Sequence, residues 1–320
     1  MVSEGVPGIS FAVFNDESIL YEHVGGVKNR QTGEPVDPET VFEAASISKT
    51  VFAYTVLSLV LDGAVDLDEP LARMVQDIPE VGYDPRAASL TPRILLSHQG
   101  GLPNWRSRLR FEAQSYSELF DEGDTLRFVA DPGAEYRYSG EGFVLLQRVI
   151  EEHAGTRVGE LIQRRVFRPL DMRRSSFLFD SRVRDNASFG HNAEGEPDKW
   201  IIGVPLASST LHTTASDLAR FGVELASQLH DHGPYSTLAT PQVEVASDGD
   251  WSLNWGLGLG IIDDGSRTWV YHGGNNVIFI ADFVYCVDDN LGYVLLTNSS
   301  NGQRVVEALE RRVFGKAIPR

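Results

Sequence analysis

The order of the predicted elements constrains the fold more than any other feature of this sequence. Segments with strand-like apolar patterns lie near both ends of the chain, and mostly helical patterns fill the middle. The expected strands are Ile9–Asn15, Ser18–His23, Gly256–Asp263, Thr268–Tyr271, Val277–Val287 and Leu291–Asn298. Two chain ends that both form strands can share one antiparallel sheet, which helices then cover. We therefore expect a discontinuous α/β domain from residues 1–65 and 206–320, with a mainly helical domain at residues 66–205.

The tetrapeptide Ser46-Ile47-Ser48-Lys49 stands directly before an apolar, helix-like run over residues 50–61. Residues three apart on a helix are neighbours, so the Ser46 hydroxyl and the Lys49 amine are expected to meet. Ser46 would lie in the first turn, where free N–H groups favour a developing negative charge. An activated serine needs a base beside it and such an anion site. The alternative is an ordinary helix-capping serine followed by a solvated lysine.

Lysine is scarce in this chain, which favours a special role for Lys49. The sequence has only four lysines, namely Lys28, Lys49, Lys199 and Lys316, and Lys49 stands at the head of an apolar run. A lysine with its ordinary pKa near 10.4 is almost fully protonated at pH 7 and is a poor base. Burial or a nearby cation would have to lower that pKa before Lys49 could act.

Two further segments carry residue types suited to the same chemistry. Tyr138-Ser139-Gly140 precedes a helix-like run, and His272-Gly273-Gly274 precedes a strand-like one. Glycines at a strand edge allow a substrate to approach the backbone closely. On its own, however, His-Gly-Gly is more often a plain turn at the start of a strand.

These three motifs, in this order, give the chain its resemblance to a known family. Ser46/Lys49, Tyr138 and His272–Gly274 resemble the Ser-x-x-Lys, Tyr-x-Asn and Lys/His-x-Gly motifs of the serine β-lactamase and penicillin-binding-protein superfamily. The chain is most similar to class C-like carboxypeptidases, D-aminopeptidases and β-lactamase-fold esterases. The resemblance implies a β-lactamase/DD-peptidase-like fold, an antiparallel sheet flanked by helices with an inserted helical domain.

The resemblance also implies a role for each matching residue. The expected catalytic residues are Ser46, Lys49 and Tyr138. The expected oxyanion and substrate-binding residues are Asn275, His272, Gly273, Gly274 and Gly140. Backbone N–H groups of Ser46 and Asn275 would face the oxyanion. Our hypothesis is that Tyr138, polarised by Lys49, takes the Ser46 proton and returns it to the leaving group, while Lys49 as the base stays open.

Two positions depart from the family pattern and bear on the substrate. Gly140 stands where most members have asparagine, and the missing amide disfavours β-lactam turnover. His272 stands where lysine is usual, and an imidazole with a pKa near 6.5 is mostly neutral at pH 7. Activity on anionic substrates is therefore expected to weaken between about pH 6 and 7.5. Neutral esters or amides are the expected substrates.

The composition of the chain limits which partners it is expected to bind. A formal net charge of −17 disfavours nucleic acids and anionic membranes, so we expect a small-molecule or peptide substrate. Cys286 is the single cysteine, which excludes an intramolecular disulfide and predicts a buried, inert thiol. With no signal-peptide pattern and no long apolar run, we expect no membrane insertion and a cytoplasmic location, although a removed signal peptide would leave no trace. The oligomeric state stays open.

The sequence thus predicts a cofactor-free serine hydrolase that forms an acyl-enzyme at Ser46 and acts on small esters or D-amino-acid amides and peptides. One alternative is β-lactamase or penicillin-binding activity, and another is a non-catalytic binding member of the same fold. A metal-dependent hydrolase is a third. For it, His230-Asp231-His232 could bind a metal, but no second cluster supports that site.

Overall fold

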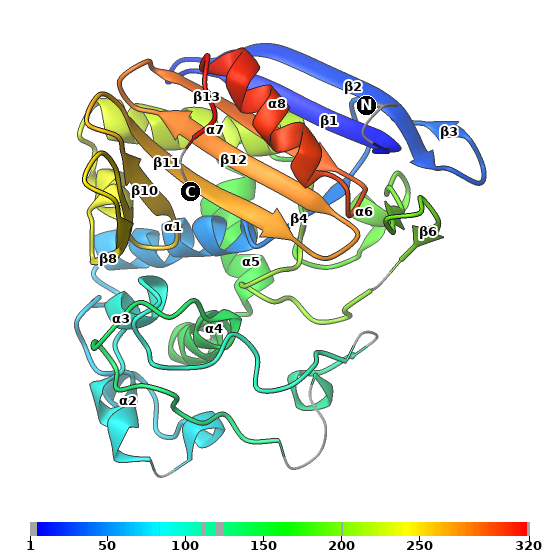
Figure 1. Cartoon of the computed structure of the whole chain (residues 1–320). Helices are drawn as coiled ribbons and strands as arrows, with labels where there is room; N and C mark the ends of the chain where they lie inside the picture. Colours follow the sequence, from blue (N-terminus) through cyan, green and yellow to red (C-terminus); the bar gives the residue numbers. More distant parts are fainter. Residues whose placement is uncertain (1–4, 83, 111–112, 120–123, 200, 319–320) are drawn as a thin grey trace.

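The fold centres on a nine-stranded antiparallel sheet (Figure 1). The computed structural model describes residues 5–82, 84–110, 113–119, 124–199 and 201–318 of the 320-residue chain. The strand order is β3-β2-β1-β13-β12-β11-β10-β9-β8. The strands are β1 (Gly8–Phe14), β2 (Ile19–Asn29), β3 (Glu34–Pro35), β8 (Val243–Ser247), β9 (Ser252–Trp255), β10 (Gly260–Asp263), β11 (Thr268–Asn275), β12 (Ile280–Cys286) and β13 (Leu291–Thr297).

The two ends of the chain meet inside this sheet. β1 pairs with β13 in antiparallel register, with Ile9 opposite Thr297. The expected sheet shared by both chain ends is therefore present. The strand expected from Gly256 begins only at Gly260, because Gly258 adopts a left-handed φ of 76° that interrupts the extended backbone. Strands β8 and β9, which form one edge, were not expected; both are short, and β8 has no buried side chain.

Helices cover both faces of the sheet, and successive strand residues alternate between the two faces. In β12, Phe283 packs in the larger core with residues of α1 (Ser48–Leu61) and α7 (Ala215–His230). Its neighbour Val284 packs on the other face, in a second core to which α8 (Gln303–Val313) contributes. Figure 1 shows α8 in front of the sheet, with α1 and α7 behind it.

Helix α1 is the central helix, and every residue from Ser48 to Leu59 is buried. Its apolar sequence explains this, because a helix that is apolar on all sides can pack between two layers. On the side away from the sheet, the Phe52 ring packs against that of Phe143 in α4, with the centroids 6.2 Å apart. Among the helices of the described residues, none has both the length and the apolarity that a membrane span requires.

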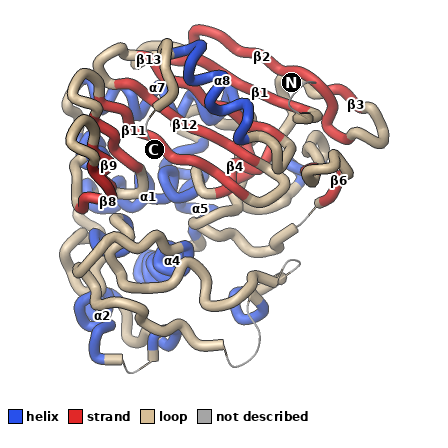
Figure 2. Tube along the Cα trace, viewed as in Figure 1, coloured by secondary structure: helices blue, strands red, loops and turns tan. Residues whose placement is uncertain are grey.

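The segment between α1 and β7 is mostly helices and long loops, and Figure 2 shows α2 and α4 with their loops in the lower part of the molecule. Its helices are α2 (Leu71–Met74), η2 (Pro79–Val81), η3 (Pro85–Ser89), α3 (Pro92–Leu96), η4 (Tyr116–Glu118), α4 (Gly140–Ala154), α5 (Val158–Ile162), η5 (Gln163–Phe167) and α6 (Ser181–Arg184). The Ser139 hydroxyl caps α4 by accepting a hydrogen bond from the Gly142 N–H at 2.8 Å. Domain boundaries at residues 65 and 205 stay a prediction.

A two-stranded ribbon of β4 (Phe42–Ala45) and β7 (Leu211–Thr213) lies beside the sheet and leads into α1. The remaining short elements are β5 (Gly190–His191), β6 (Pro197–Asp198) and η6 (Pro234–Ala239). The ribbon matters for function, because the Ser-x-x-Lys motif follows β4 directly.

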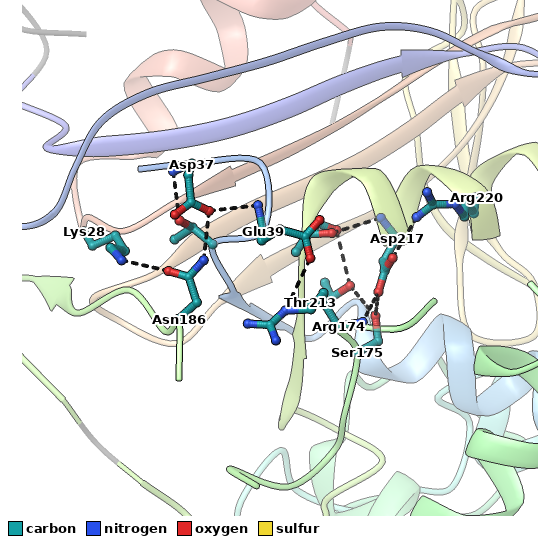
Figure 3. A network of polar contacts seen from close by, with 11 residues as sticks. Lys28, Asp37, Glu39, Arg174, Ser175, Asn186, Thr213, Asp217 and Arg220 are labelled. Atoms are coloured by element: carbon teal, nitrogen blue, oxygen red, sulfur yellow. Dashed lines mark hydrogen bonds and ion pairs between the residues drawn. The ribbon is translucent and has the colours of Figure 1, made fainter. Parts of the chain in front are cut away.

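A polar network holds the chain before β4 and after β7 (Figure 3). Ahead of β4, the Asn186 amide donates to Asp37 at 2.8 Å and accepts from Lys28 Nζ at 2.7 Å. Beyond β7, the Asp217 carboxylate in the first turn of α7 accepts from the Ser175 hydroxyl at 2.9 Å. These contacts hold the end of the ribbon where β4 begins and β7 ends, and the Ser46 turn follows β4 at the opposite end.

Candidate active site

Ser46 lies in the turn between β4 and α1. The helix begins at Ser48, so the expected position of Ser46 inside the first turn is wrong. The reason is Ala45, whose left-handed φ of 48° turns the chain sharply before the helix can start. The Ser48 hydroxyl holds this turn by accepting from the Leu211 N–H at 2.9 Å and donating to the Ala45 carbonyl. A strained backbone of this kind costs about 1–3 kcal/mol and persists only where surrounding contacts enforce it.

Lys49 meets Ser46 as the spacing predicts. Its Nζ lies 3.1 Å from Ser46 Oγ and donates to the Ser208 carbonyl at 2.7 Å. The side chain is 1% exposed, and this burial lowers the pKa of Lys49 to about 7. Both contacts are to uncharged oxygen atoms, so no negative charge in the described residues is paired with the amine to raise its pKa again.

Tyr138 completes the group of polar side chains at the turn. Its phenol interacts with the Ser46 hydroxyl, and Lys49 Nζ lies 4.8 Å from the centre of its ring. Burial raises the pKa of Tyr138 well above its ordinary value, although the nearby Ser46 hydroxyl opposes this shift. The structure therefore brings the three expected catalytic side chains together from the β4–α1 turn and the start of α4.

Aromatic side chains hold Tyr138 in place. The His98 ring packs on it with the centroids 4.3 Å apart, and Trp255 lies edge-on at 6.0 Å. His98 Nδ1 accepts a hydrogen bond from the Ser139 N–H at 3.0 Å, which fixes the backbone directly after Tyr138. Burial lowers the pKa of His98 well below its ordinary value, so this imidazole is a neutral packing and hydrogen-bonding group.

His272 lies behind the site and is only 2% exposed. Its Nδ1–H donates to the Gly273 carbonyl at 2.7 Å. Burial, reinforced by the charge of Lys49, lowers the pKa of His272 to about 3. The expectation that His272 loses its charge between pH 6 and 7.5 is therefore wrong, because the imidazole is already neutral throughout that range.

The backbone N–H of Asn275 points away from β12. The next N–H, of Asn276, donates across the hairpin to the Phe279 carbonyl at 3.0 Å. Successive N–H groups of an extended strand point to opposite edges, so the Asn275 N–H points to the other edge. Strand β10 pairs with β11 only over residues 268–271, which leaves that edge unpaired at Asn275. This N–H is therefore available to a group bound beside Ser46.

The two glycines of the His-Gly-Gly segment have different surroundings. A Cβ on Gly274 would lie 2.3 Å from the backbone oxygen of Ala44, so this glycine lets β11 touch β4. A Cβ on Gly273 would meet nothing nearer than Asp282 Oδ1, at 4.0 Å. For Gly274, close contact with β4 is thus a sufficient reason for glycine, where we expected room for a substrate.

A cavity of about 290 Å³ opens at the Ser46 turn. Of the expected site residues, Ser46, Lys49, Tyr138 and Asn275 line it. Gly140, His272, Gly273 and Gly274 are not among the lining residues. The other lining residues are Glu43, Asn104, Trp105, Ser107, Arg108, Leu109, Ile202, Ser209, Thr210, His212, Asn276 and Val277.

Trp105 accounts for the glycine at position 140. A Cβ on Gly140 would lie 2.6 Å from the indole ring, so any side chain there would displace Trp105. Neighbouring contacts fasten this loop to the start of α4. The Gly140 N–H donates to Asn104 Oδ1 at 2.8 Å, and Arg106 forms a two-pronged ion pair with the buried Glu141, with a shortest distance of 2.7 Å. The loop, held in place by these contacts, forms one wall of the cavity.

Glu43 is a lining residue that the motif analysis did not single out. It lies in β4 opposite His212, three residues before Ser46, and Asn276 Nδ2 donates to its Oε2 at 2.7 Å. Burial raises the pKa of Glu43 to about 7. The available signal was an acidic residue inside the otherwise apolar strand Phe42–Ala45, directly before the expected nucleophile.

No metal site is formed in the part of the chain that the structure describes, since no three His, Cys, Asp or Glu side chains converge there, His230-Asp231-His232 included. The expected inert thiol is buried as predicted, and burial raises the pKa of Cys286 to about 11. The thiol is therefore protonated, and unreactive, at neutral pH.

Comparisons with known proteins identify relatives along the whole chain. The sequence profile of the family described as Beta-lactamase matches residues 1–316. Esterase EstB of Burkholderia gladioli is 28% identical over 213 residues, which cover 62% of this chain and 53% of the esterase. A D-aminopeptidase of Brucella anthropi is 24% identical over 311 residues, which cover 92% of this chain and 57% of that enzyme. The chain thus spans little more than half the length of these two curated relatives.

A solved structure shares the fold. The octameric penicillin-binding protein homologue from Pyrococcus abyssi superposes with a TM-score of 0.82 at 23% identity, covering 99% of this chain and 75% of that chain. At this level of identity the likeness concerns the fold alone. The expected β-lactamase/DD-peptidase-like architecture is confirmed.

Proposed function

We propose, from the premise that this chain belongs to the Beta-lactamase family, that it is a serine hydrolase that forms an acyl-enzyme at Ser46. The observation that carries the proposal is the 3.1 Å contact between Lys49 Nζ and Ser46 Oγ, at a site where burial brings the pKa of Lys49 to about 7. About half of such a lysine is neutral at pH 7. A neutral amine within hydrogen-bond distance of a hydroxyl can accept its proton.

We assign the base to Lys49 in place of our earlier hypothesis for Tyr138. Burial raises the pKa of Tyr138, so its phenolate is scarce at neutral pH, whereas burial makes the neutral form of Lys49 common. The two groups contact the same hydroxyl, so their protons are coupled. The Tyr138 hydroxyl is then suited to donate a proton to the leaving group.

In acylation, Lys49 takes the Ser46 proton while Oγ attacks the substrate carbonyl carbon. The tetrahedral oxyanion lies between the N–H groups of Ser46 and Asn275. As the carbonyl re-forms, the bond to the leaving group breaks and the leaving group takes the Tyr138 proton, which Lys49 replaces. Water then attacks the ester carbon, Lys49 takes a proton from it, and Ser46 is released with its proton restored.

The walls of the site favour small uncharged acyl groups. His272 is neutral and buried, so it supplies no charge for a substrate carboxylate. The Trp105 ring fills the space beside Gly140, and the cavity holds only about 290 Å³. We therefore propose small esters and amino-acid amides or peptides as the substrate class, a preference over β-lactams, and no cofactor.

The proposal is tested by the intact mass of the protein after treatment with a fluorophosphonate. One adduct on the wild type and none on Ser46→Ala is the expected result. A panel of p-nitrophenyl esters, D- and L-alanine p-nitroanilides and a chromogenic cephalosporin then ranks the substrates. An unlabelled wild type that hydrolyses none of them would leave a non-catalytic binding member of the family as the better description.

A further inference from the structure

We propose that Glu43 is a subsite for the amino group of the substrate, so that the cavity selects esters and amides of amino acids whose amine is free. This inference rests on the proposed function of Ser46 and names the substrate class of the same site. An amine on the acyl part of a substrate would meet a carboxylate in the cavity wall.

The position of Glu43 follows from the β4–β7 ribbon. Glu43 lies opposite His212 in the register and lines the same cavity as Ser46. Ser46 is three residues further along the chain, after the sharp turn at Ala45. The carboxylate and the nucleophile are thus carried by one continuous, rigidly held segment, which gives a bound acyl group a fixed distance between them.

The carboxylate of Glu43 has spare capacity for a ligand. Its Oε2 accepts the bond from Asn276 Nδ2 at 2.7 Å, and Asn276 also donates to the Ser209 carbonyl at 3.2 Å. Within the described ranges, Oε1 has no hydrogen-bond donor and no Lys or Arg forms an ion pair with Glu43. A carboxylate can accept several hydrogen bonds, so most of its capacity is unused.

The two lysines near Glu43 are engaged elsewhere. Lys199 acts on Glu43 through its charge, but its Nζ lies over the rings of Phe179 and Phe189, at 4.1 and 4.7 Å from their centres. Lys49 is held by Ser46 and the Ser208 carbonyl. Arg108 also lines the cavity, and its side chain is exposed to solvent.

A half-buried carboxylate without a paired cation is costly, and desolvation in the cavity wall raises the pKa of Glu43 to about 7 for this reason. An ammonium group bound at Oε1 would supply the missing charge in a cavity from which the substrate excludes water. The alternative role for Glu43 is purely structural, as a support for the Asn276 loop. Glutamine at position 43 keeps the acceptor for Asn276 and removes the charge, so it separates the two roles.

The test compares two substrates that differ only in the amine: alanine p-nitrophenyl ester and propionic acid p-nitrophenyl ester. The measured quantity is kcat/KM for the amino ester divided by kcat/KM for the propionic ester. It is determined at a pH above the pKa of Glu43 and with each enantiomer of alanine. We expect the wild type to prefer the amino ester and Glu43→Gln to lower the ratio by about tenfold to a hundredfold. Glu17→Gln, an exposed carboxylate outside the cavity, makes the same change in net charge and should leave the ratio as in the wild type.

A binding experiment gives a second measurement that needs no turnover. 1-Aminoethylboronic acid and ethylboronic acid both add to an active serine, and only the first carries the amine. Tighter binding of the amino compound by the wild type, lost in Glu43→Gln, supports the subsite. Equal affinity for the pair, or a substrate ratio that Glu43→Gln leaves unchanged, overturns it. If the fluorophosphonate does not label Ser46 in the wild type, the proposed hydrolase function itself fails, which is a different outcome from failure of the amine subsite.

Discussion

The indole of Trp105 occupies the space that any side chain at position 140 would need. A Cβ on Gly140 would lie 2.6 Å from Trp105 Cζ2, and the Gly140 N–H is bound to Asn104 at 2.8 Å. Glycine at 140 and tryptophan at 105 therefore depend on each other. The departure from the family motif at Gly140 is matched by a bulky residue from a loop distant in sequence.

Replacing Gly140 with asparagine should displace Trp105 and disturb this wall of the cavity. We expect Gly140→Asn to lower the free energy of unfolding by about 1–3 kcal/mol, as overpacking does, and to lower kcat/KM for small esters. The double variant Trp105→Ala/Gly140→Asn should recover part of that stability, because the clash is removed. Urea unfolding of both single variants and of the double variant gives the coupling energy. Strictly additive effects would contradict the dependence of the two residues on each other.

The pH dependence of the reaction should follow Lys49. Because its pKa is about 7 and the neutral form is the base, kcat/KM should rise with pH through about 7 and fall about tenfold per pH unit below it. His272 should contribute nothing to this profile, since it is neutral above its pKa of about 3. The measurement is kcat/KM for an uncharged ester between pH 5 and 9. A profile that is flat from pH 5 to 7 would contradict Lys49 as the base.

Lys49 should also lower the stability of the fold at neutral pH. Its pKa in the folded protein is below the ordinary 10.5, so between pH 7 and 10.5 the unfolded chain binds more protons and stability rises with pH. Lys49→Met, which removes the buried amine, should be inactive yet more stable than the wild type by about 1 kcal/mol or more at pH 7. The difference should shrink as the pH approaches 10. Urea unfolding at pH 7 and pH 10 measures this difference in stability between Lys49→Met and the wild type. A difference that grows with pH would contradict a lowered pKa of Lys49 in the folded protein.

The two neighbouring glycines at 273 and 274 should respond differently to alanine. Gly274→Ala would push on the Ala44 carbonyl, and so on β4 and the Ser46 turn; we expect a loss of about 1–3 kcal/mol and a lower kcat. Gly273→Ala has room for the methyl group and should change stability by less than about 1 kcal/mol. Thermal unfolding and single-turnover acylation compare the pair. Equal losses would mean that the backbone contact with Ala44 is not the reason for Gly274.

The buried ion pair between Arg106 and Glu141 should matter more than an exposed pair nearby. Glu141→Gln removes the carboxylate charge from this largely buried pair with Arg106, and breaking such a pair costs about 3–5 kcal/mol. Glu135→Gln breaks the exposed pair with Arg137, and exposed pairs are worth about 0–1 kcal/mol. Denaturant unfolding of the two variants gives the comparison. Similar losses would contradict the view that Arg106 and Glu141 fasten the Trp105 loop to α4.

Much of this arrangement could be predicted from the sequence, because local patterns carry it. The apolar run after Lys49 predicts a buried helix, and the spacing of Ser46 and Lys49 predicts their contact, which the structure has at 3.1 Å. Strand-like patterns at both chain ends predict a shared sheet, and β1 does pair with β13. These features depend on residues that are close in the sequence, or on the apolar pattern within a single helix or strand.

Other features depend on contacts between distant segments, which no local pattern encodes. Nothing near Gly140 indicates that Trp105 fills the space beside it. The burial of His272, and with it the low pKa, depends on the surrounding aromatic residues, and a sequence motif shows only the residue type. The role of Glu43 could not be predicted from the sequence, because it depends on the cavity wall, which forms only when β4, β7 and the Asn276 loop meet.

The pairing of β1 with β13 has a consequence for synthesis of the protein. Strand β1 lies between β2 and β13, which follows all the other described strands in the sequence, so this sheet cannot close on the nascent chain until residues 291–297 have emerged. An unfinished chain would therefore carry Ser46 and Lys49 without the assembled sheet that supports them. Hydrolytic activity should first arise after β13 has been translated.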